Sequence, residues 1–122
     1  MHSDSQIHEE FSPSSDNVEL AAEVFAILSD PTRIRIILAL RKHVELSVNR
    51  LSEIVGKKPS GVSKHLARLR MARMVTTRQD GTSVLYRLAD EHGIYLVEEA
   101  LKQAEHAVYG GFPPHHRSES AR

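Results

Sequence analysis

One hairpin signal in a mostly helical chain constrains the fold more than any other feature of this sequence. Residues 74–88 read MVTTRQDGTSVLYRL, with Asp80-Gly81 near the middle of a run of strand-forming residues. Asp-Gly between such runs is a strong short-range signal for a β-hairpin. We therefore predict two antiparallel strands, whose most strand-like residues are Val75, Thr77, Val84, Tyr86 and Leu88.

Five segments with helical character surround this hairpin. Four precede it, at residues 18–29, from Pro31 to about 42, at 45–56 and at 60–73, and one follows it at 90–108. Apolar residues recur at helical spacing in these segments, which predicts one buried face on each. The residues expected inside are Leu20, Val24, Ile27, Leu28, Ile34, Ile37, Leu38, Leu40, Leu51, Ile54, Val55, Val62, Leu66 and Leu69.

Polar residues at the ends of these segments support the helix boundaries. Asp30, Ser47 and Asp90 are expected N-caps, because their side-chain oxygens accept hydrogen bonds from the unpaired N–H groups of a first turn. Pro31 is tolerated at a first helical position, and Gly56 is expected to end the third helix. The resulting order is helix, helix, helix–turn–helix, hairpin, helix. We predict a mainly α winged helix-turn-helix fold with a β-hairpin wing, which is a DNA-reading architecture.

The charge distribution agrees with a DNA-binding protein. The formal net charge is zero, but residues 33–88 carry thirteen basic residues against three acidic ones. Residues 1–32 carry seven acidic residues and no Lys or Arg, and residues 89–122 carry six acidic against three basic. A basic centre with acidic flanks gives the molecule a polarised field.

The segment 60–73 has the pattern of a recognition helix. At 100° per residue, Val62, Leu66 and Leu69 share a core-facing side. Small or polar residues occupy the other side, and residues 57–73 contain no acid, so the backbone can approach a phosphate chain closely. Residues near the hairpin tip are expected to reach an adjacent minor groove or backbone. The predicted DNA-binding residues are Lys57, Lys58, Ser60, Ser63, Lys64, Arg68, Arg78, Gln79 and Thr82.

Several classes of protein are disfavoured by what the sequence lacks. There is no cysteine, which removes disulfides, thiolate nucleophiles and sulfur-ligated metals. The catalytic and phosphate-binding motifs G-x-x-x-x-G-K-[ST], H-E-x-x-H and G-x-S-x-G are also missing, so we do not expect an enzyme or a small organic substrate. No apolar run approaches the roughly 20 residues that cross a bilayer, and the first residues do not resemble a signal peptide. We expect a cytoplasmic protein without membrane contact.

Four stretches together resemble the ArsR/SmtB family of metal-sensing bacterial repressors. They are LSDPTRIRIILAL, LSEIVG, SGVSKHLARLRMARMVTTRQDGTSVLYRL and the closing helix, and the resemblance covers about residues 18–108. It implies a winged helix-turn-helix homodimer that represses an operator on double-stranded DNA until an inducer binds, with its first and last helices at the dimer interface. Residues 1–16 are then a mobile acidic tail, 17–109 the DNA-binding and dimerisation domain, and 110–122 a His-containing tail.

The family has two kinds of metal site, and the resemblance favours one of them here. The site near the third helix uses cysteines, which this chain lacks. The site on the closing helix uses an acid and a histidine at the start, which Asp90 and His92 match, and two donors near the end. His106 matches one end donor, but Gln103 stands where a histidine is common, so the usual tetrahedral zinc site is incomplete.

Geometry requires two chains for a site on this helix. His92 and His106 are fourteen residues apart, which is roughly 21 Å along a helix. Two antiparallel copies of the helix bring His92 of one chain to His106 of the other. A second stripe, formed by Ile94, Val97, Leu101, Ala104 and Val108, supplies apolar packing.

The histidines after the closing helix extend this donor set. Glu105 and His106 are followed, after a short Gly/Pro segment, by His115 and His116. An AEH motif followed by paired histidines is similar to the nickel- and cobalt-sensing branch of the family. Zinc usually takes four ligands, whereas Ni²⁺ and Co²⁺ often accept six nitrogen and oxygen ligands. The predicted inducer is therefore Ni²⁺ or Co²⁺, bound by Asp90, His92, Glu105, His106, His115 and His116, in a repressor that controls metal efflux.

Other interpretations remain open at this stage. The inducer is alternatively Zn²⁺, or the repressor responds to no metal. The tail histidines are alternatively without function, and His2 and His8 are minor candidates for additional ligands. A metal-buffering or scaffold protein with this fold is a further alternative, which the basic cluster in residues 57–73 disfavours.

Overall fold

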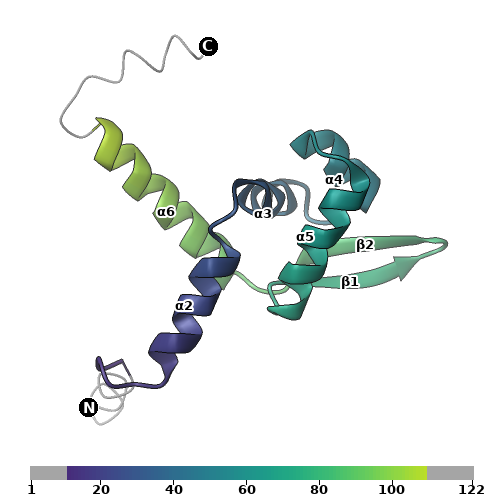
Figure 1. Ribbon diagram of the computed structural model, residues 1–122. Coiled ribbons are helices and arrows are strands. Elements are labelled where there is room, and N and C mark those ends of the chain that lie inside the picture. Colours follow the sequence, from purple (N-terminus) through teal and green to yellow (C-terminus); the bar gives the residue numbers. More distant parts are fainter. Residues whose placement is uncertain (1–10, 110–122) are drawn as a thin grey trace.

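A computed structural model describes residues 11–109 of the 122-residue chain. His2, His8 and the predicted His-containing tail at 110–122 therefore lie outside the described residues. The elements follow the predicted order and form a winged helix-turn-helix (Figure 1). They are α2 (Asn17–Ile27), α3 (Pro31–His43), α4 (Val48–Val55), α5 (Pro59–Met71), β1 (Val75–Asp80), β2 (Ser83–Leu88) and α6 (His92–Tyr109).

The molecule divides into a compact body and two projecting helices. The body consists of α3, α4, α5 and the β1–β2 hairpin, which extends to one side as a wing (Figure 1). Helices α2 and α6 leave the opposite side and diverge from each other, and we call them the two arms. Within the described part of the chain, none of the helices is long and apolar enough to cross a membrane.

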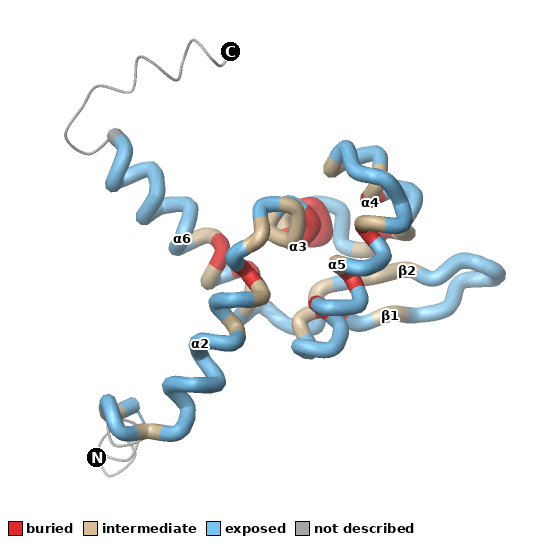
Figure 2. Tube along the Cα trace, viewed as in Figure 1, coloured by how far each residue is buried: buried red, intermediate tan, exposed pale blue. Residues whose placement is uncertain are grey.

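The hydrophobic core lies in the body, around α3. Burial is concentrated where α3 meets α4, α5 and the start of α6, and the outer parts of both arms are exposed (Figure 2). Helix α2 has no buried residue, and α6 buries only two in its first two turns. The buried residues are Leu28, Ile36, Ile37, Ala39, Leu40, Leu46, Leu51, Val62, Leu66, Leu69, Val75, Ile94 and Val97.

The structure corrects some of the predicted core. Ile54 is 38% exposed, and Ile34 and Leu38 are only partly buried, while Ile36 and Ala39 are buried although neither was predicted. The reason is that α3 is the central helix and packs against α4, α5, β2 and α6. A helix with neighbours on several sides buries a wider arc than the single stripe that amphipathic periodicity assumes.

The predicted helix ends are confirmed with small shifts. Asp30 Oδ2 accepts a hydrogen bond from the Arg33 N–H at 3.1 Å, and Ser47 Oγ accepts one from the Arg50 N–H at 3.2 Å. Gly56 follows α4 with a left-handed φ of 70°. Asp90 Oδ1 accepts from the His92 N–H at 2.9 Å, so the prediction of a capping role holds although α6 itself begins at His92.

The hairpin turn lies one residue later than predicted. Asp80 pairs with Ser83 at the end of the ladder, so the two-residue turn is Gly81-Thr82. Gly81 has a φ of 65° and Thr82 is not among the residues with positive φ. Glycine alone in the first central position is the pattern of a type II′ turn, whose twist matches that of the flanking strands.

Helix α5 is joined to the wing by a Schellman motif. The Met74 N–H donates to the Leu69 carbonyl and the Arg73 N–H donates to the Arg70 carbonyl, both at 2.9 Å. Arg73 occupies the left-handed position of this motif with a φ of 63°, where glycine is the usual residue. The motif fixes the direction in which β1 leaves the recognition helix.

Candidate nucleic-acid interface and metal donors

The faces of α5 divide as the sequence predicts. Val62, Leu66 and Leu69 are fully buried at 0% exposure. The opposite face consists of exposed residues, which are Ser60, Ser63, Lys64, Ala67 and Met71. The core contacts therefore fix the helix and leave a face of mostly small and polar side chains open to solvent.

This exposed face forms one wall of a groove. A concavity of about 580 Å³ lies between α5 and β2, and it is lined by Ser63, Ala67, Arg70, Met71 and Tyr86. The small side chains of Ser63 and Ala67 keep the groove accessible. Helix and wing thus present a continuous concave surface, with Arg70 at its wall.

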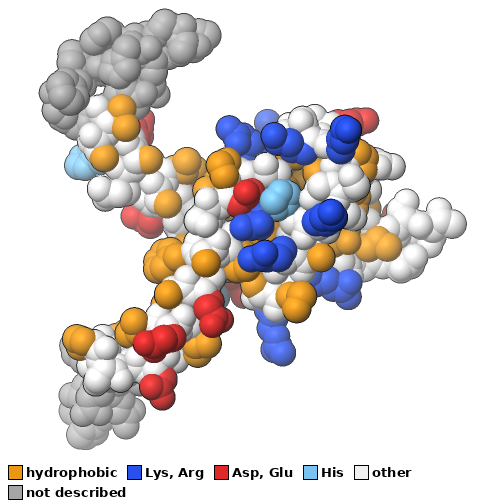
Figure 3. All heavy atoms as spheres, in the orientation of Figure 1, with side chains coloured by type: hydrophobic (Ala, Val, Ile, Leu, Met, Phe, Trp, Pro, Cys, Tyr) orange, Lys and Arg blue, Asp and Glu red, His pale blue; other side chains and the backbone are white. Residues whose placement is uncertain are grey.

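Basic side chains surround this surface. Lys57, Lys58, Lys64 and Arg68 are all exposed, and Lys and Arg gather over the body while acidic side chains follow α2 (Figure 3). Arg68 also lines a second concavity of about 590 Å³, where α2 meets the end of α5. The charge asymmetry in the sequence is therefore a spatial separation between body and arm.

The turn between α4 and α5 is held by backbone contacts. The Gly56 and Lys57 N–H groups both donate to the Ser52 carbonyl, at 2.9 and 3.2 Å, and the Ser52 hydroxyl donates to the Lys57 carbonyl. These bonds fix the backbone at Lys57, just before Lys58, which is the N-cap of α5. The cationic start of the recognition helix is therefore positioned by local structure.

The wing residues differ in their availability. Gln79 and Thr82 are exposed near the hairpin tip. Arg78 is instead bound by Glu45, whose oxygens accept from Arg78 Nε at 2.8 Å and Nη2 at 2.9 Å. Hydrogen bonding to Arg78 outweighs partial burial and holds the pKa of Glu45 below its ordinary value, while the same bond raises the pKa of Arg78.

A polar junction connects the α2 arm to the recognition helix. Arg33 Nε donates to the Ile27 carbonyl at the end of α2 at 2.6 Å, and its Nη1 lies 3.0 Å from His65 Nδ1 on α5. Because a guanidinium has only donors, we assign His65 Nδ1 as the acceptor. His65 Nε2 faces Asp30 Oδ2 at 3.8 Å. One arginine therefore contacts the end of the arm and the DNA-facing helix together.

Burial and hydrogen bonding have opposite effects on the pKa of Asp30, the acidic residue of this junction. Burial opposes the ionisation of Asp30, but the hydrogen bond from the Arg33 N–H and the positive charge of the Arg33 side chain outweigh it. The pKa of Asp30 is therefore lower than its ordinary value.

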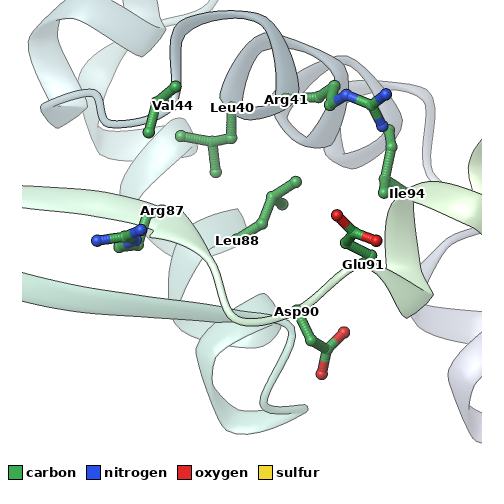
Figure 4. Close-up of a pocket in the computed structure, with 8 residues that line it drawn as sticks. All are labelled: Leu40, Arg41, Val44, Arg87, Leu88, Asp90, Glu91 and Ile94. Carbon is green, nitrogen blue, oxygen red and sulfur yellow. The ribbon is translucent and has the colours of Figure 1, made fainter.

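The predicted metal donors at the start of α6 are exposed. Asp90 Oδ1 accepts from the His92 N–H, and the Asp90 carboxylate points away from the apolar centre of the neighbouring pocket (Figure 4). That pocket, of about 230 Å³, lies between the ends of α3 and β2 and the start of α6. Glu91 is engaged by Tyr95, whose hydroxyl donates to it at 2.7 Å. Both acids line this pocket, and Asp90 is the one whose carboxylate points away from its centre.

The donors at the end of α6 do not meet those at its start within one chain. Glu105 and His106 are exposed on the last turns of α6. His106 lies fourteen residues beyond His92. Within residues 11–109 there is no group of three or more His, Asp or Glu side chains placed to hold a metal ion. His115 and His116 lie outside the described residues. A metal site that uses donors from both ends of α6 therefore needs a second chain.

The sequence analysis did not identify two residues that hold predicted or neighbouring side chains in place, Glu45 and Arg33. Glu45 is one of only three acids in the basic section 33–88, and that rarity was a signal that it neutralises a particular cation. The contact of Arg33 with His65 spans thirty-two positions, and no local pattern marks it.

Comparisons with known proteins agree with this geometry. Residues 30–77 match the family described as "Bacterial regulatory protein, arsR family". The chain is 52% identical over 103 residues to the HTH-type transcriptional regulator KmtR of Mycobacterium tuberculosis, covering 84% of this chain and 78% of KmtR. It is 35% identical over 89 residues to NmtR, another HTH-type transcriptional regulator of that organism, covering 73% of each.

Solved structures show the same likeness. The crystal structure of M. tuberculosis Rv0081 matches with a TM-score of 0.69 and 33% identity, covering 78% of this chain and 95% of that one. The antimony-specific transcriptional repressor AntR matches with a TM-score of 0.67 and 28% identity, covering 80% of this chain and 95% of that one. KmtR, NmtR and AntR are transcriptional regulators, and the identity to KmtR together with the family match shows that the chain belongs to the ArsR/SmtB family of bacterial regulatory proteins.

Proposed function

We propose that this protein is a transcriptional repressor that binds operator DNA as a homodimer and is released by Ni²⁺ or Co²⁺. The observation that carries the proposal is the pairing of two features in one chain. A basic, acid-free recognition helix is presented by the body, and exposed side chains that can donate to a metal lie at both ends of α6. The resemblance to KmtR and NmtR, which are HTH-type transcriptional regulators, supports the role in transcription.

The DNA-binding part of the proposal rests on α5 and the wing. Ser60, Ser63 and Lys64 lie on the open face of α5 and are proposed to approach base edges and phosphates in the major groove. Lys57, Lys58 and Arg68 are proposed to contact phosphates, and Arg78, Gln79 and Thr82 to contact the adjacent backbone or minor groove. Two copies of the body, held by the arms, are needed to match successive half-sites about 34 Å apart.

The metal-binding part rests on donor chemistry. We propose that Asp90 and His92 of one chain join Glu105, His106, His115 and His116 of its partner. Imidazole nitrogens and carboxylate oxygens in this number suit Ni²⁺ and Co²⁺ better than a four-coordinate zinc site. The bound ion neutralises the carboxylates and links the two arms. Because a metal ion and a proton compete for the same imidazole nitrogens, acid weakens the proposed site.

The arms provide the route from metal to DNA. Linking the arms is proposed to change the angle between the two bodies, so that the recognition helices no longer match successive major grooves. A coupling free energy of about 1–3 kcal/mol is typical of such linkage and corresponds to a change of roughly 5–150-fold in operator affinity. A metal that favours one dimer shape by this amount is sufficient to release the repressor.

The proposal is tested by titrating metals into a protein–DNA complex. A duplex selected by the protein from a random pool serves as the operator, and fluorescence anisotropy reports release as Ni²⁺, Co²⁺ or Zn²⁺ is added. We expect the protein to leave the duplex at lower concentrations of Ni²⁺ or Co²⁺ than of Zn²⁺. Release by Zn²⁺ alone favours the zinc-responsive alternative, and no release by any metal favours a metal-independent repressor.

Variants assign the proposed ligands. His92→Ala, His106→Ala and the double change His115→Ala/His116→Ala should keep operator affinity but respond poorly to Ni²⁺ or Co²⁺. His43→Ala is the matched control, because it removes an exposed histidine at the end of α3 that is not among the proposed ligands. A tail variant that releases DNA at the same nickel concentration as the parent excludes the tail from the sensor.

Two further variants locate the DNA-facing surface. Lys64→Ala and Arg68→Ala should each weaken DNA binding and reduce the slope of log affinity against log salt by about one unit. Lys102→Ala on α6 is the control, because it removes an exposed cation from an arm. Unchanged affinity and slope in both α5 variants would mean that another element enters the groove.

A further inference from the structure

The wing carries an ion pair whose geometry matches that of an arginine bound to phosphate. Two oxygens of Glu45 accept two parallel hydrogen bonds from the fork of Arg78, at 2.8 and 2.9 Å. Arg87 on β2 brings Nη1 to 3.7 Å from the same carboxylate. A guanidinium fork binds carboxylate and phosphate in the same bidentate manner. While Glu45 is in place, this edge of the Arg78 fork is therefore filled.

The backbone fixes Glu45 in this position on its N-terminal side. Val44 has φ 72° and ψ −58°, and the Glu45 N–H donates to the His43 carbonyl at 2.8 Å. This is a γ-turn with positive φ, a rare conformation that is strained for a β-branched residue. Val44 is 60% exposed, so burial of its own side chain does not account for the turn. The turn redirects the chain from the end of α3 toward the wing.

The backbone fixes Glu45 on its C-terminal side as well. Leu46 forms a β-bridge with Tyr86 on β2, with N–H to carbonyl distances of 3.0 and 2.8 Å in the two directions. Val44 and Arg87 both line the pocket between α3 and β2, Val44 beside α3 and Arg87 on β2 (Figure 4). The side chain of Glu45 is only 20% exposed, against 51% for that of Arg78. Glu45 is therefore a positioned anion and not a mobile surface acid.

We propose that Glu45 competes with DNA phosphate for Arg78 and thereby lowers the affinity of the wing for any duplex. This inference rests on the proposed function, because it assumes that the wing approaches DNA. Phosphate contacts supply most of the non-specific affinity of a DNA-binding protein, and useful specificity depends on keeping that affinity low. When the carboxylate of Glu45 occupies Arg78, it reduces the non-specific affinity for DNA and leaves the exposed face of α5 unchanged.

The charges around the pair agree with this role. Among residues 33–88, only Glu45, Glu53 and Asp80 are acidic, against thirteen basic residues. Glu45 contacts two of those cations, and its low pKa keeps it ionised at neutral pH. Its removal therefore changes the electrostatics of the wing more than the loss of an average surface acid.

The central test is Glu45→Gln, which keeps the shape of the side chain and removes its charge. We expect this variant to bind a non-specific 30-base-pair duplex about two- to fivefold more tightly than the parent, the factor that corresponds to an exposed ion pair. In the Arg78→Ala background the gain should disappear. The measurement is fluorescence anisotropy at several salt concentrations, with the dimer mass of each variant checked by sedimentation.

Glu99→Gln is the matched control. Glu99 also forms an exposed ion pair, with Lys102 at 3.2 Å, but it lies on the α6 arm away from the wing. It therefore reports the effect of removing one negative charge in general. The proposal would be overturned if Glu99→Gln raised the affinity for the duplex as much as Glu45→Gln does. It would also be overturned if Glu45→Gln still raised that affinity in the Arg78→Ala background.

A measurement on the free protein separates this proposal from the proposed function. The carboxyl of Glu45, followed by NMR, should titrate below the ordinary value for glutamate in the parent and return toward it in Arg78→Ala. An ordinary pKa in the parent contradicts the ion pair itself. If the pair is intact but the parent binds no duplex, the proposed function and the competition that depends on it both fail. If the parent binds duplex and Glu45→Gln does not tighten it, only the competition fails.

Discussion

The body and the arms contain similar kinds of apolar side chain, but only the body covers them. Leu66 and Leu69 on α5 are fully buried, whereas Leu20 and Phe25 on α2 are 58% and 60% exposed. The contrast is sharpest within α6, where Ile94 and Val97 are buried and Leu101 is 46% exposed. One apolar stripe thus begins in the core of its own chain and continues into solvent. Exposed apolar side chains in such a row indicate a surface for another protein copy.

The largest expected effect comes from making the same substitution in both regions. Leu66→Ala should lower the free energy of unfolding by about 2–5 kcal/mol, because it leaves a cavity in the core. Leu101→Ala should cost less than about 1 kcal/mol in the isolated chain, because half of that side chain is already in water. Urea unfolding followed by circular dichroism at several protein concentrations separates folding from association. Equal costs would mean that the arm is as tightly packed as the body.

The next largest effect tests what covers the arms. The double change Phe25→Ala/Leu101→Ala should weaken dimerisation by about 1–2 kcal/mol or more, which is roughly a 5- to 30-fold rise in the dissociation constant. Val84→Ala in the wing is the control, because Val84 is a 39% exposed apolar residue of the body. Sedimentation equilibrium measures each constant. A parent that is monomeric at micromolar concentration, with and without metal, would contradict the dimer.

The difference between body and arms also explains how far the sequence could predict the fold. Local signals were sufficient for element order, because Asp30, Ser47 and Gly56 act on their own neighbouring backbone. Periodicity correctly divided α5, because that helix packs on one side only. It failed for Ile36, since α3 has neighbours on several sides. Periodicity also gave the arms a buried face that a single chain does not bury.

The candidate site divides in the same way. The exposed face of α5 follows from its core residues, so the positions of Ser63 and Lys64 were predictable from a helical wheel. The ion pair between Glu45 and Arg78 joins residues thirty-three positions apart and depends on a γ-turn at Val44 that no propensity predicts. The metal donors remain a prediction, because their meeting depends on a second chain and on residues outside those described.

A smaller effect is expected at the junction between arm and body. Asp30→Ala should cost about 1 kcal/mol at neutral pH, because it removes the N-cap of α3 and the anion beside His65. Asp30→Asn keeps a capping oxygen and should cost less. The comparison shows how much of the junction depends on charge and how much on the cap.

The same junction predicts a dependence on pH. The pKa of Asp30 is lower in the folded protein than in the unfolded chain, so its ionised form stabilises the fold above the unfolded value of about 4. That contribution is lost as the pH falls through the lower folded value. The difference in unfolding free energy between the parent and Asp30→Ala should therefore shrink as the pH falls from neutral through the lowered folded pKa of Asp30, by about the contribution of the charge. A pH-independent difference would mean that the cap alone matters.

The smallest expected effect compares two helix ends within the body. Gly56 after α4 and Arg73 after α5 both adopt left-handed φ values, of 70° and 63°. Glycine adopts this conformation without strain, while a residue with a Cβ is destabilised by roughly 1–2 kcal/mol, partly offset by the greater unfolded-state freedom of glycine. Arg73→Gly should therefore stabilise the protein by up to about 1 kcal/mol, whereas Gly56→Ala should destabilise it. Thermal unfolding measures both.

The strained Arg73 beside the recognition helix allows a test that measures stability and DNA binding in the same variant. Arg73 is exposed and lies two residues before β1, where its charge adds to the basic surface. If that charge contacts phosphate, Arg73→Gly should be more stable than the parent but bind DNA less tightly, with a salt slope reduced by about one unit. Arg73→Asn serves as the control, because asparagine tolerates the left-handed conformation and also lacks the charge. If Arg73→Gly is more stable than the parent and its DNA affinity and salt slope are unchanged, Arg73 contributes neither to stability nor to DNA binding. The difference between Arg73 and Gly56 would then be explained by backbone strain alone.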